Sequence, residues 1–309
     1  MALAVAFDDV KKNREKREAP GKTGGSTIFL GSRDKPDAPH ARLAEQDPGR
    51  YTAPHFHTRD QFQIVVGGKG RFGRHEIAPF GLHFTRAYTP YGPLIADERA
   101  GLTFIVLRTK FDPGSHDIPE ERELLLQVPD RHPLQITSHA SFPEFQSHIS
   151  LNALPDMRDE NGLSAYALSM KPHTTTLAPD PSGGAGQYVV IVKGSVLHDG
   201  REYGAPALIY VWPNEPRCQV TSGAAGLDAL VVNFPRPPKA SQGATTSVHT
   251  ASGFRTWRCE YCSFVYDEAA GIPAEGIAPG TRWQDVPETW TCPDCGTCKS
   301  DFQMILQEP

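Results

Sequence analysis

Four cysteines near the C-terminal end of the chain have the spacing of a metal site. Cys259, Cys262, Cys292 and Cys295 form two Cys-x2-Cys pairs separated by 29 residues. Two such pairs brought together place four thiolates at the corners of a tetrahedron, and this soft donor set selects zinc or iron. Two disulfides are the alternative, but each pair is too close in sequence to close a long loop, and nothing in the chain indicates secretion. The spacing therefore predicts a four-cysteine metal site.

The stretch from Trp257 to Phe302 carries a distinctive set of residues between and after the two pairs. They are Tyr266-Asp267, Gly280-Thr281, Pro287, Trp290, Pro293, Gly296, Lys299 and Phe302. With the four cysteines, this set resembles rubredoxin, the small one-iron electron carrier. The resemblance implies one iron held by Cys259, Cys262, Cys292 and Cys295, which cycles between the ferric and ferrous states, and no catalytic residue in this domain.

The composition of the same stretch agrees with a carrier. Six aromatic side chains follow Cys259 in it: Tyr261, Phe264, Tyr266, Trp283, Trp290 and Phe302. A domain of about 50 residues cannot build a sufficient core alone, so metal and aromatic side chains must hold it together. Because all four ligands come from the protein, no position stays open for a substrate, which favours electron transfer over catalysis. A zinc-ribbon-like binding protein is the further alternative.

Two cysteines lie outside this set of four. Cys298 follows Cys295 by one more x-x step and is expected to be a free surface thiol, with a redox or alternative ligand role as the other interpretation. Cys218 lies alone in the preceding part of the chain. Reduced, metal-binding cysteines fit the cytoplasm, which we expect as the location.

The rest of the chain is predicted to be mainly β, because short β-type runs alternate with Gly/Pro turns from residue 26 onwards. Residues 8–18 could form a short charged helix, and residues 118–128 a connecting helix or irregular segment. A repeat is visible, because Gln61–Gly68 (QFQIVVGG) resembles Gln187–Gly194 (QYVVIVKG). Two similar β modules in tandem predict a double barrel. The expected domains are an extension (1–27), two barrels (28–130 and 131–236), a flexible linker (237–253) and the iron domain (254–309).

The first module carries Gly49-x5-His55-x-His57-x3-Gln61-x6-Gly68. This pattern is similar to the first cupin motif, with Gln61 where the family usually has Glu. The resemblance implies two tandem double-stranded β-helix barrels. Since His55 and His57 are two residues apart on a strand, both should face the barrel interior, where imidazoles can bind iron, manganese or zinc.

A second metal in the first barrel is nevertheless the less favoured alternative. The last cupin ligand should fall at Ile95, which cannot bind a metal, and His83 is the nearest substitute. The favoured interpretation is a metal-free cavity that binds a small molecule, mediates a homodimer or carries the iron domain. With a metal, the barrel would be an oxygenase or other redox enzyme supplied with electrons by the iron domain. The second barrel should be metal-free, because Pro181 and Gly183 occupy its His positions.

Charge is concentrated in the last domain. Residues 254–309 hold four basic and nine acidic side chains, which accounts for the whole net charge of −5. An acidic domain suits docking to a basic redox protein such as a reductase and argues against nucleic acid. Asp294, inside the second cysteine pair, is the expected docking residue. No apolar run approaches the length of a membrane span, and the charges after residue 7 make a poor signal peptide.

Overall fold

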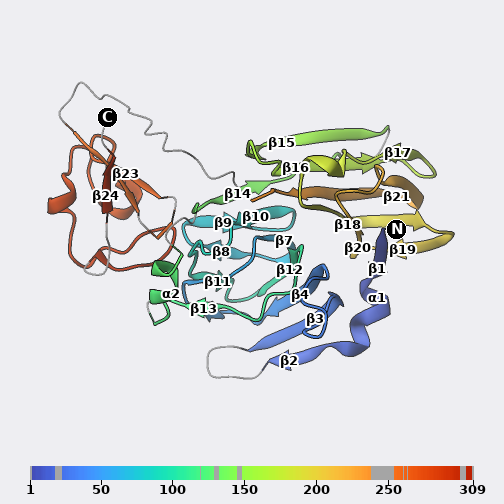
Figure 1. Ribbon diagram of the computed structural model, residues 1–309, viewed down its shortest axis with the longest axis horizontal. Helices are drawn as coiled ribbons and strands as arrows, with labels where there is room; N and C mark the ends of the chain where they lie inside the picture. The colour runs from blue at the N-terminus through green and yellow to red at the C-terminus, as the bar shows by residue number, and fades with distance from the viewer. Residues whose placement is uncertain are drawn as a thin grey trace.

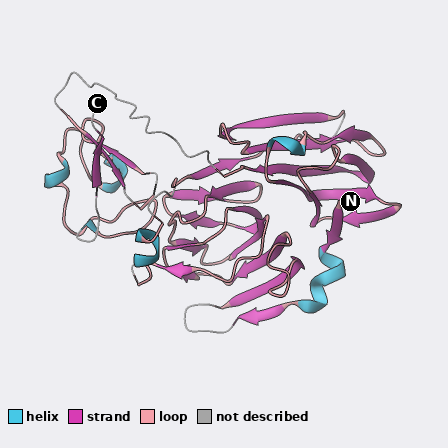
Figure 2. Cartoon of the chain, viewed as in Figure 1, coloured by secondary structure: helices cyan, strands magenta, loops and turns pink. Residues whose placement is uncertain are grey.

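The computed structural model describes residues 2–17, 23–118, 120–128, 132–144, 148–237, 254–259, 261–262, 264–299 and 304–307. Strands dominate these residues, and helices are short (Figure 2). Two adjoining β barrels form the body, and the small C-terminal domain lies at one end, next to the first barrel (Figure 1). The mainly β, two-barrel architecture is confirmed. Most of the expected linker, residues 238–253, lies outside the described residues.

The first barrel is built from one large and two small antiparallel sheets. The large sheet has the order β14-β10-β7-β12-β4-β3-β2, and the smaller ones are β5-β11-β8-β9 and β13-β6. The strands are β2 (Glu15–Arg17), β3 (Gly24–Leu30), β4 (His40–Gln46), β5 (Tyr51–Thr52), β6 (His55–Phe56), β7 (Gln61–Gly68), β8 (Gly70–Phe72), β9 (His75–Ile77), β10 (Gly81–Thr85), β11 (Leu94–Ala96), β12 (Leu102–Arg108), β13 (His116–Asp117) and β14 (Gln135–His139).

The second barrel is one eight-stranded sheet with the order β1-β20-β18-β21-β16-β15, with β19 on β18 and β17 on β21. Its long central strands change register at bulges, one of them between Ile191 and Lys193, which lets them bend. The elements are β1 (Leu3–Ala6), β15 (Ser150–Arg158), β16 (Ser164–Met170), β17 (Thr175–Leu177), η2 (Pro181–Gly183), β18 (Gly186–His198), β19 (Arg201–Gly204), β20 (Ala207–Val211) and β21 (Gln219–Phe234).

Side chains alternate between the two faces of the central strands and so contribute to two hydrophobic cores. On β12, Ile105 and Leu107 pack with Tyr188 and Leu230 from the second barrel in the layer between the two large sheets. Neighbouring residues on β12, such as Val106, point the other way, into the first barrel. The two barrels therefore share a buried core rather than being joined only through the chain.

The N-terminal segment belongs to both barrels. Strand β1 pairs with β20 of the second barrel, while β2 and β3 pair in the first. The expected boundary after residue 27 falls inside β3. The charged helix expected for residues 8–18 is instead α1 (Phe7–Val10), η1 (Lys11–Asn13) and β2. Pairing with an exposed sheet edge outweighs the weak helix propensity of so short a segment. The helix expected after residue 118 is the single turn α2 (Glu123–Leu126).

The C-terminal domain has little regular structure. Three short strands form its sheet in the order β23-β22-β24, namely β22 (Thr256–Cys259), β23 (Val265–Asp267) and β24 (Met304–Gln307). Two 3-10 turns, η3 (Pro273–Glu275) and η4 (Trp283–Asp285), lie between β23 and the second cysteine pair. Most of this domain is loop, so its shape depends on the cysteine site and on the side chains around it.

Candidate functional site

The four predicted cysteines converge. Their sulfur atoms all lie within 4.8 Å of one another, and each residue is at most 1% exposed. The Cys259 and Cys295 sulfurs are 4.0 Å apart, and those of Cys262 and Cys292 are 3.6 Å apart. A tetrahedral metal with metal–sulfur bonds of about 2.3 Å requires sulfurs roughly 3.8 Å apart. The donor set therefore fits a single metal ion.

Backbone turns hold the sulfurs in place. Gly296, at φ 69°, adopts a left-handed conformation, and its N–H donates to the Cys292 carbonyl at 2.7 Å. The N–H of Cys262 donates to the Cys259 sulfur at 3.3 Å. The Thr297 oxygen lies 3.3 Å from the Cys295 sulfur, so its hydroxyl can donate to a thiolate. Such donors favour the more negative state of a bound metal and so tune its potential.

Burial makes this site depend on a positive ion. Burial raises the pKa of both Cys262 and Cys292 well above that of an ordinary thiol. Without a cation these two thiols stay protonated, so thiolates form here only when a metal cation balances their charge. Among the residues that the structure describes, the four cysteines are the one group of three or more His, Cys, Asp or Glu side chains close enough to share an ion.

Aromatic rings and one buried carboxylate support the cysteine site. The rings of Trp283 and Trp290 meet edge to face at 5.4 Å. Glu268, 1% exposed, accepts hydrogen bonds from the Trp257 indole and the Trp283 N–H and pairs with Arg282. Although burial opposes it, these bonds lower the pKa of Glu268 to about 2. Nothing in the sequence pattern predicts this role, because Glu268 is one of nine acidic residues in the last domain.

The second cysteine pair faces the first barrel, which corrects the expectation for Asp294. Its carboxylate is only 5% exposed and forms an ion pair with Arg74 of the first barrel at 2.9 Å. Burial, partly offset by Arg74, raises the pKa of Asp294 to about 6. Asp294 is therefore a contact within the chain and is not available to an external protein. Cys298 is exposed and Cys218 is buried.

The first barrel contains a cavity of about 420 Å³. His55, His57 and Gln61 all line it, as the cupin-like pattern predicted, and all three are buried. Further lining comes from apolar side chains such as Leu94 and Phe104. Its size and mixed lining are typical of small-molecule sites.

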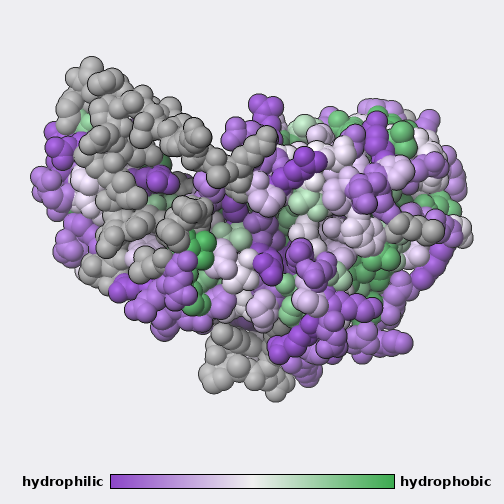
Figure 3. Space-filling model, viewed as in Figure 1, coloured by the Kyte–Doolittle hydropathy of each residue, from purple (hydrophilic) through white to green (hydrophobic). Residues whose placement is uncertain are grey.

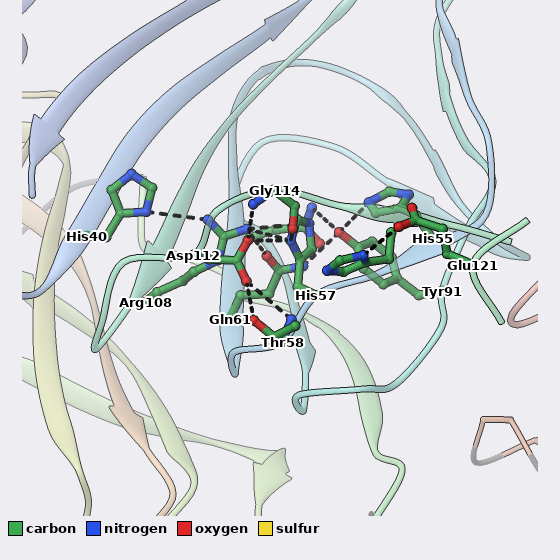
Figure 4. A network of polar contacts seen from close by, with 12 residues as sticks. His40, His55, His57, Thr58, Gln61, Tyr91, Arg108, Asp112, Gly114 and Glu121 are labelled. Carbon is green, nitrogen blue, oxygen red and sulfur yellow. Dashed lines mark hydrogen bonds and ion pairs between the residues drawn. The ribbon is translucent and has the colours of Figure 1, made fainter. Parts of the chain in front are cut away.

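A guanidinium lies among the expected ligands of the cavity (Figure 4). Arg108, 2% exposed, donates to the Gln61 oxygen at 2.7 Å and lies 3.3–3.4 Å from both ring nitrogens of His57. Behind His57, Asp112 contacts its Nδ1 at 2.9 Å. A carboxylate behind an imidazole is the arrangement that orients a metal-binding histidine. His57 thus fits a metal ligand, but the Arg108 cation already lies beside it.

Tyr91 organises the other side of the cavity. Its hydroxyl oxygen lies 2.9 Å from Nε2 of His55 and accepts hydrogen bonds from Gln61 at 2.7 Å and Gln63 at 3.3 Å. Burial raises the pKa of Tyr91 to about 12, so the phenol stays neutral. Tyr91, Arg108 and Asp112 were missed in the sequence, since none belongs to the cupin-like pattern.

His83, the suggested substitute ligand, makes no hydrogen bond to this network, but its ring packs against that of Tyr91 with the ring centres 5.3 Å apart. It is 1% exposed, and its Nδ1 lies 2.8 Å from the Thr137 hydroxyl. Its Nε2 has no hydrogen-bond partner among the described residues. In the second barrel, Gln187 donates to the Asn233 side chain and the Pro179 carbonyl, which is a structural role.

Comparison with known proteins assigns the C-terminal domain. A family model described as rubredoxin matches residues 256–302. Rubredoxin-2 of Pseudomonas aeruginosa is 61% identical over 51 residues, which are 16% of this chain and 93% of that protein. The chain belongs to the rubredoxin family. Rubredoxin-2 of Rhodococcus erythropolis is 55% identical over 56 residues, 18% of this chain and 89% of the relative. A rubredoxin domain with a four-cysteine cluster supports one iron.

The barrels resemble solved bicupin structures. A mutant of Bacillus subtilis oxalate decarboxylase aligns over 78% of this chain and 79% of its own, with a TM-score of 0.51 and 13% identity. A Lactobacillus farciminis oxalate decarboxylase complex with formate aligns over 76% and 86%, with a TM-score of 0.50 and 13% identity. At such identities the likeness concerns the fold alone, and it confirms the tandem cupin prediction. In the described residues, no helix is long and apolar enough to cross a membrane.

Two buried histidines should make the first barrel sensitive to acid. Burial lowers the pKa of His40 to about 4 and that of His83 to about 3, well below the value of 6.5 in an unfolded chain. At a pH between the folded and unfolded pKa values, the unfolded chain binds more protons than the folded protein. The free energy of unfolding therefore falls as the pH falls. From pH 7 to 5 we expect a loss of about 2 kcal/mol for each histidine, measured by denaturant unfolding.

A substitution separates this effect from general acid sensitivity. The variant His83→Gln should lose about 2 kcal/mol of the pH dependence, whereas Gln219→Asn, which changes no titratable group at an exposed position of the second barrel, should keep all of it. An equal pH dependence in both variants would contradict the assignment.

Proposed function

We propose that this protein transfers single electrons through one iron held by Cys259, Cys262, Cys292 and Cys295. The observation that carries the proposal is the convergence of four buried sulfurs at tetrahedral spacing. All four donors come from the chain, so a bound iron would have no open position for a substrate. Such a site supports electron transfer and not catalysis at the iron.

The residues of the chain set the conditions for this transfer. Iron supplies a one-electron couple when bound. The two cysteine turns fix the sulfur positions, so little rearrangement is needed between oxidation states. The Cys262 N–H and the Thr297 hydroxyl lie close enough to stabilise negative charge on the sulfurs. Burial excludes water, which protects the thiolates from oxidation and strengthens these interactions.

The metal can be identified by colour and composition. Purified protein should contain one iron per chain, be red when oxidised and bleach on reduction. Replacing Cys259 or Cys292 with Ser should abolish the colour because each removes a sulfur donor. Cys298→Ser should keep it, because that thiol is exposed and outside the group of four. A colourless zinc protein that shows no redox response after iron reconstitution would rule out the carrier proposal.

We also propose that the external redox partner is a protein with a basic face, such as a reductase. With Asp294 buried, the exposed acids of the iron domain include Glu275 and Asp285. Asp285→Lys should therefore slow reduction of the iron by such a partner, and raising salt should slow it in the natural protein, since screening limits attraction to about 8 Å. Stopped-flow bleaching across a salt series measures both effects.

The matched control for charge is Asp156→Lys, at an exposed position of the second barrel. It makes the same charge change far along the chain from the iron domain and should leave the rate nearly unchanged. If the rate of iron reduction changes neither with salt nor in Asp285→Lys, docking is not electrostatic.

A second candidate is a redox enzyme whose first barrel binds its own metal and receives electrons from the iron domain. The observation that favours it is the contact of the iron domain with Pro54, next to His55 in the cavity wall. His55, His57 and Gln61 would hold the metal in competition with Arg108.

Metal analysis tests this second candidate. If it holds, the natural protein should contain two metals per chain, and the His55→Ala/His57→Ala variant should retain one while keeping its red colour. One metal per chain in both proteins, after purification with iron, manganese or zinc, would leave the first barrel as a metal-free cavity.

A further inference from the structure

The second cysteine pair is covered by the first barrel. Arg74, in the turn between β8 and β9, pairs with Asp294 and places its guanidinium 5.5 Å from the centre of the Phe264 ring. Gln135 on β14 donates to the Asp294 carbonyl at 3.5 Å. A turn and a strand of the barrel region, which are distant in sequence, therefore contact the same cysteine turn. Because Asp294 is only 5% exposed, its carboxylate lies inside this contact rather than at its rim.

The backbones approach closely at two glycines. A Cβ on Gly296 would lie 2.3 Å from a ring carbon of Pro54, so no larger residue fits there without movement. A Cβ on Gly73 of the barrel would lie 2.7 Å from the Pro293 carbonyl. Both glycines also have positive φ, at 69° and 57°. The two surfaces thus match at the level of the backbone.

Apolar burial extends the contact. Phe56, Ile118 and Leu125 of the first-barrel region form one buried cluster with the cysteines and Phe264. Phe56 and Leu125 are fully buried. In Figure 1 the turn of α2 and strand β13 lie beside the iron domain, and Figure 3 shows hydrophobic atoms at this boundary on a mostly hydrophilic face. An ion pair, fitted backbones and a shared apolar cluster distinguish this contact from a chance encounter.

The contact determines which face of the iron site a second protein can reach. Electron transfer needs close approach, and the turn that carries Cys292 and Cys295 holds two of the four sulfurs. Pro54 occupies the position next to Gly296, and both of its neighbours, Ala53 and His55, line the first-barrel cavity. An external protein can use this route only if the iron domain separates from the barrel.

We propose that the first barrel is the built-in docking partner of the iron domain, which shields the second cysteine pair from external redox proteins. External partners then exchange electrons through the remaining face, near Asp285, while the shielded face lies against Pro54, whose neighbours Ala53 and His55 line the first-barrel cavity. This inference rests on the proposed one-iron function for its kinetic part, but the docked arrangement stands without it.

The first test is solution scattering of the full chain. The natural protein should give the compact profile of the docked arrangement. The variant Arg74→Glu/Pro54→Glu sets a carboxylate against Asp294 and adds bulk against Gly296, so it should give a larger radius of gyration with unchanged circular dichroism. An extended natural protein, or a variant that stays compact, would overturn the docking. A colourless but compact protein would instead overturn only the proposed function.

The second test is access to the iron. Reduction by a flavoprotein reductase should be about tenfold faster in the Arg74→Glu/Pro54→Glu variant, because the covered turn becomes reachable, while reduction by dithionite should change less than about twofold. Arg74→Lys keeps the positive charge, and Arg99→Glu makes the same charge change at an exposed turn of the same barrel; both should behave as the natural protein. An extended variant reduced by the reductase at the natural rate would refute shielding.

Discussion

The close contact between Gly296 and Pro54 governs how the two parts of this protein relate. It is possible only because one partner lacks a side chain and the other is a rigid ring. Around it, the Arg74–Asp294 ion pair and the cluster containing Phe56 fix the orientation of the iron domain. A cysteine turn that could serve a diffusing partner is thereby committed to a surface of its own chain. The iron domain is therefore held against the first barrel by direct contacts as well as by the chain that links them.

Within the first barrel, the decisive feature is a buried cation. A guanidinium moved out of water must be compensated, and Arg108 finds Gln61 and His57, with Asp112 behind His57. The neutral His57 ring thus lies between the positive charge of Arg108 and the negative charge of Asp112. Although His57 and Asp112 have the arrangement of a metal ligand and its supporting carboxylate, the space beside His57 holds an arginine. A metal bound at His57 would have to displace the Arg108 guanidinium or lie beside its positive charge.

The iron site and the fold class could be predicted from sequence because both depend on local spacing. Each Cys-x2-Cys pair brings its two sulfurs together through a short local turn, and a repeated β pattern predicts repeated barrels. Arg108, Tyr91 and Asp112 could not be predicted, because they meet His57 and His55 only after strands distant in sequence pair. The helix expected for residues 8–18 was right only in its first part, where α1 and η1 lie: its end is the strand β2, which pairs with β3.

The same limit explains why charge counting misjudged the docking surface. The sequence shows that the last domain has nine acidic residues, but it does not show which of their carboxylates are exposed to water. Asp294 is turned towards Arg74, and Glu268 is buried beneath two tryptophans with Arg282 as its partner. Each of these carboxylates therefore has its charge balanced inside the protein and contributes little to long-range attraction. The electrostatic face offered to another protein is set by the exposed remainder, which includes Glu275 in η3 and Asp285 in η4.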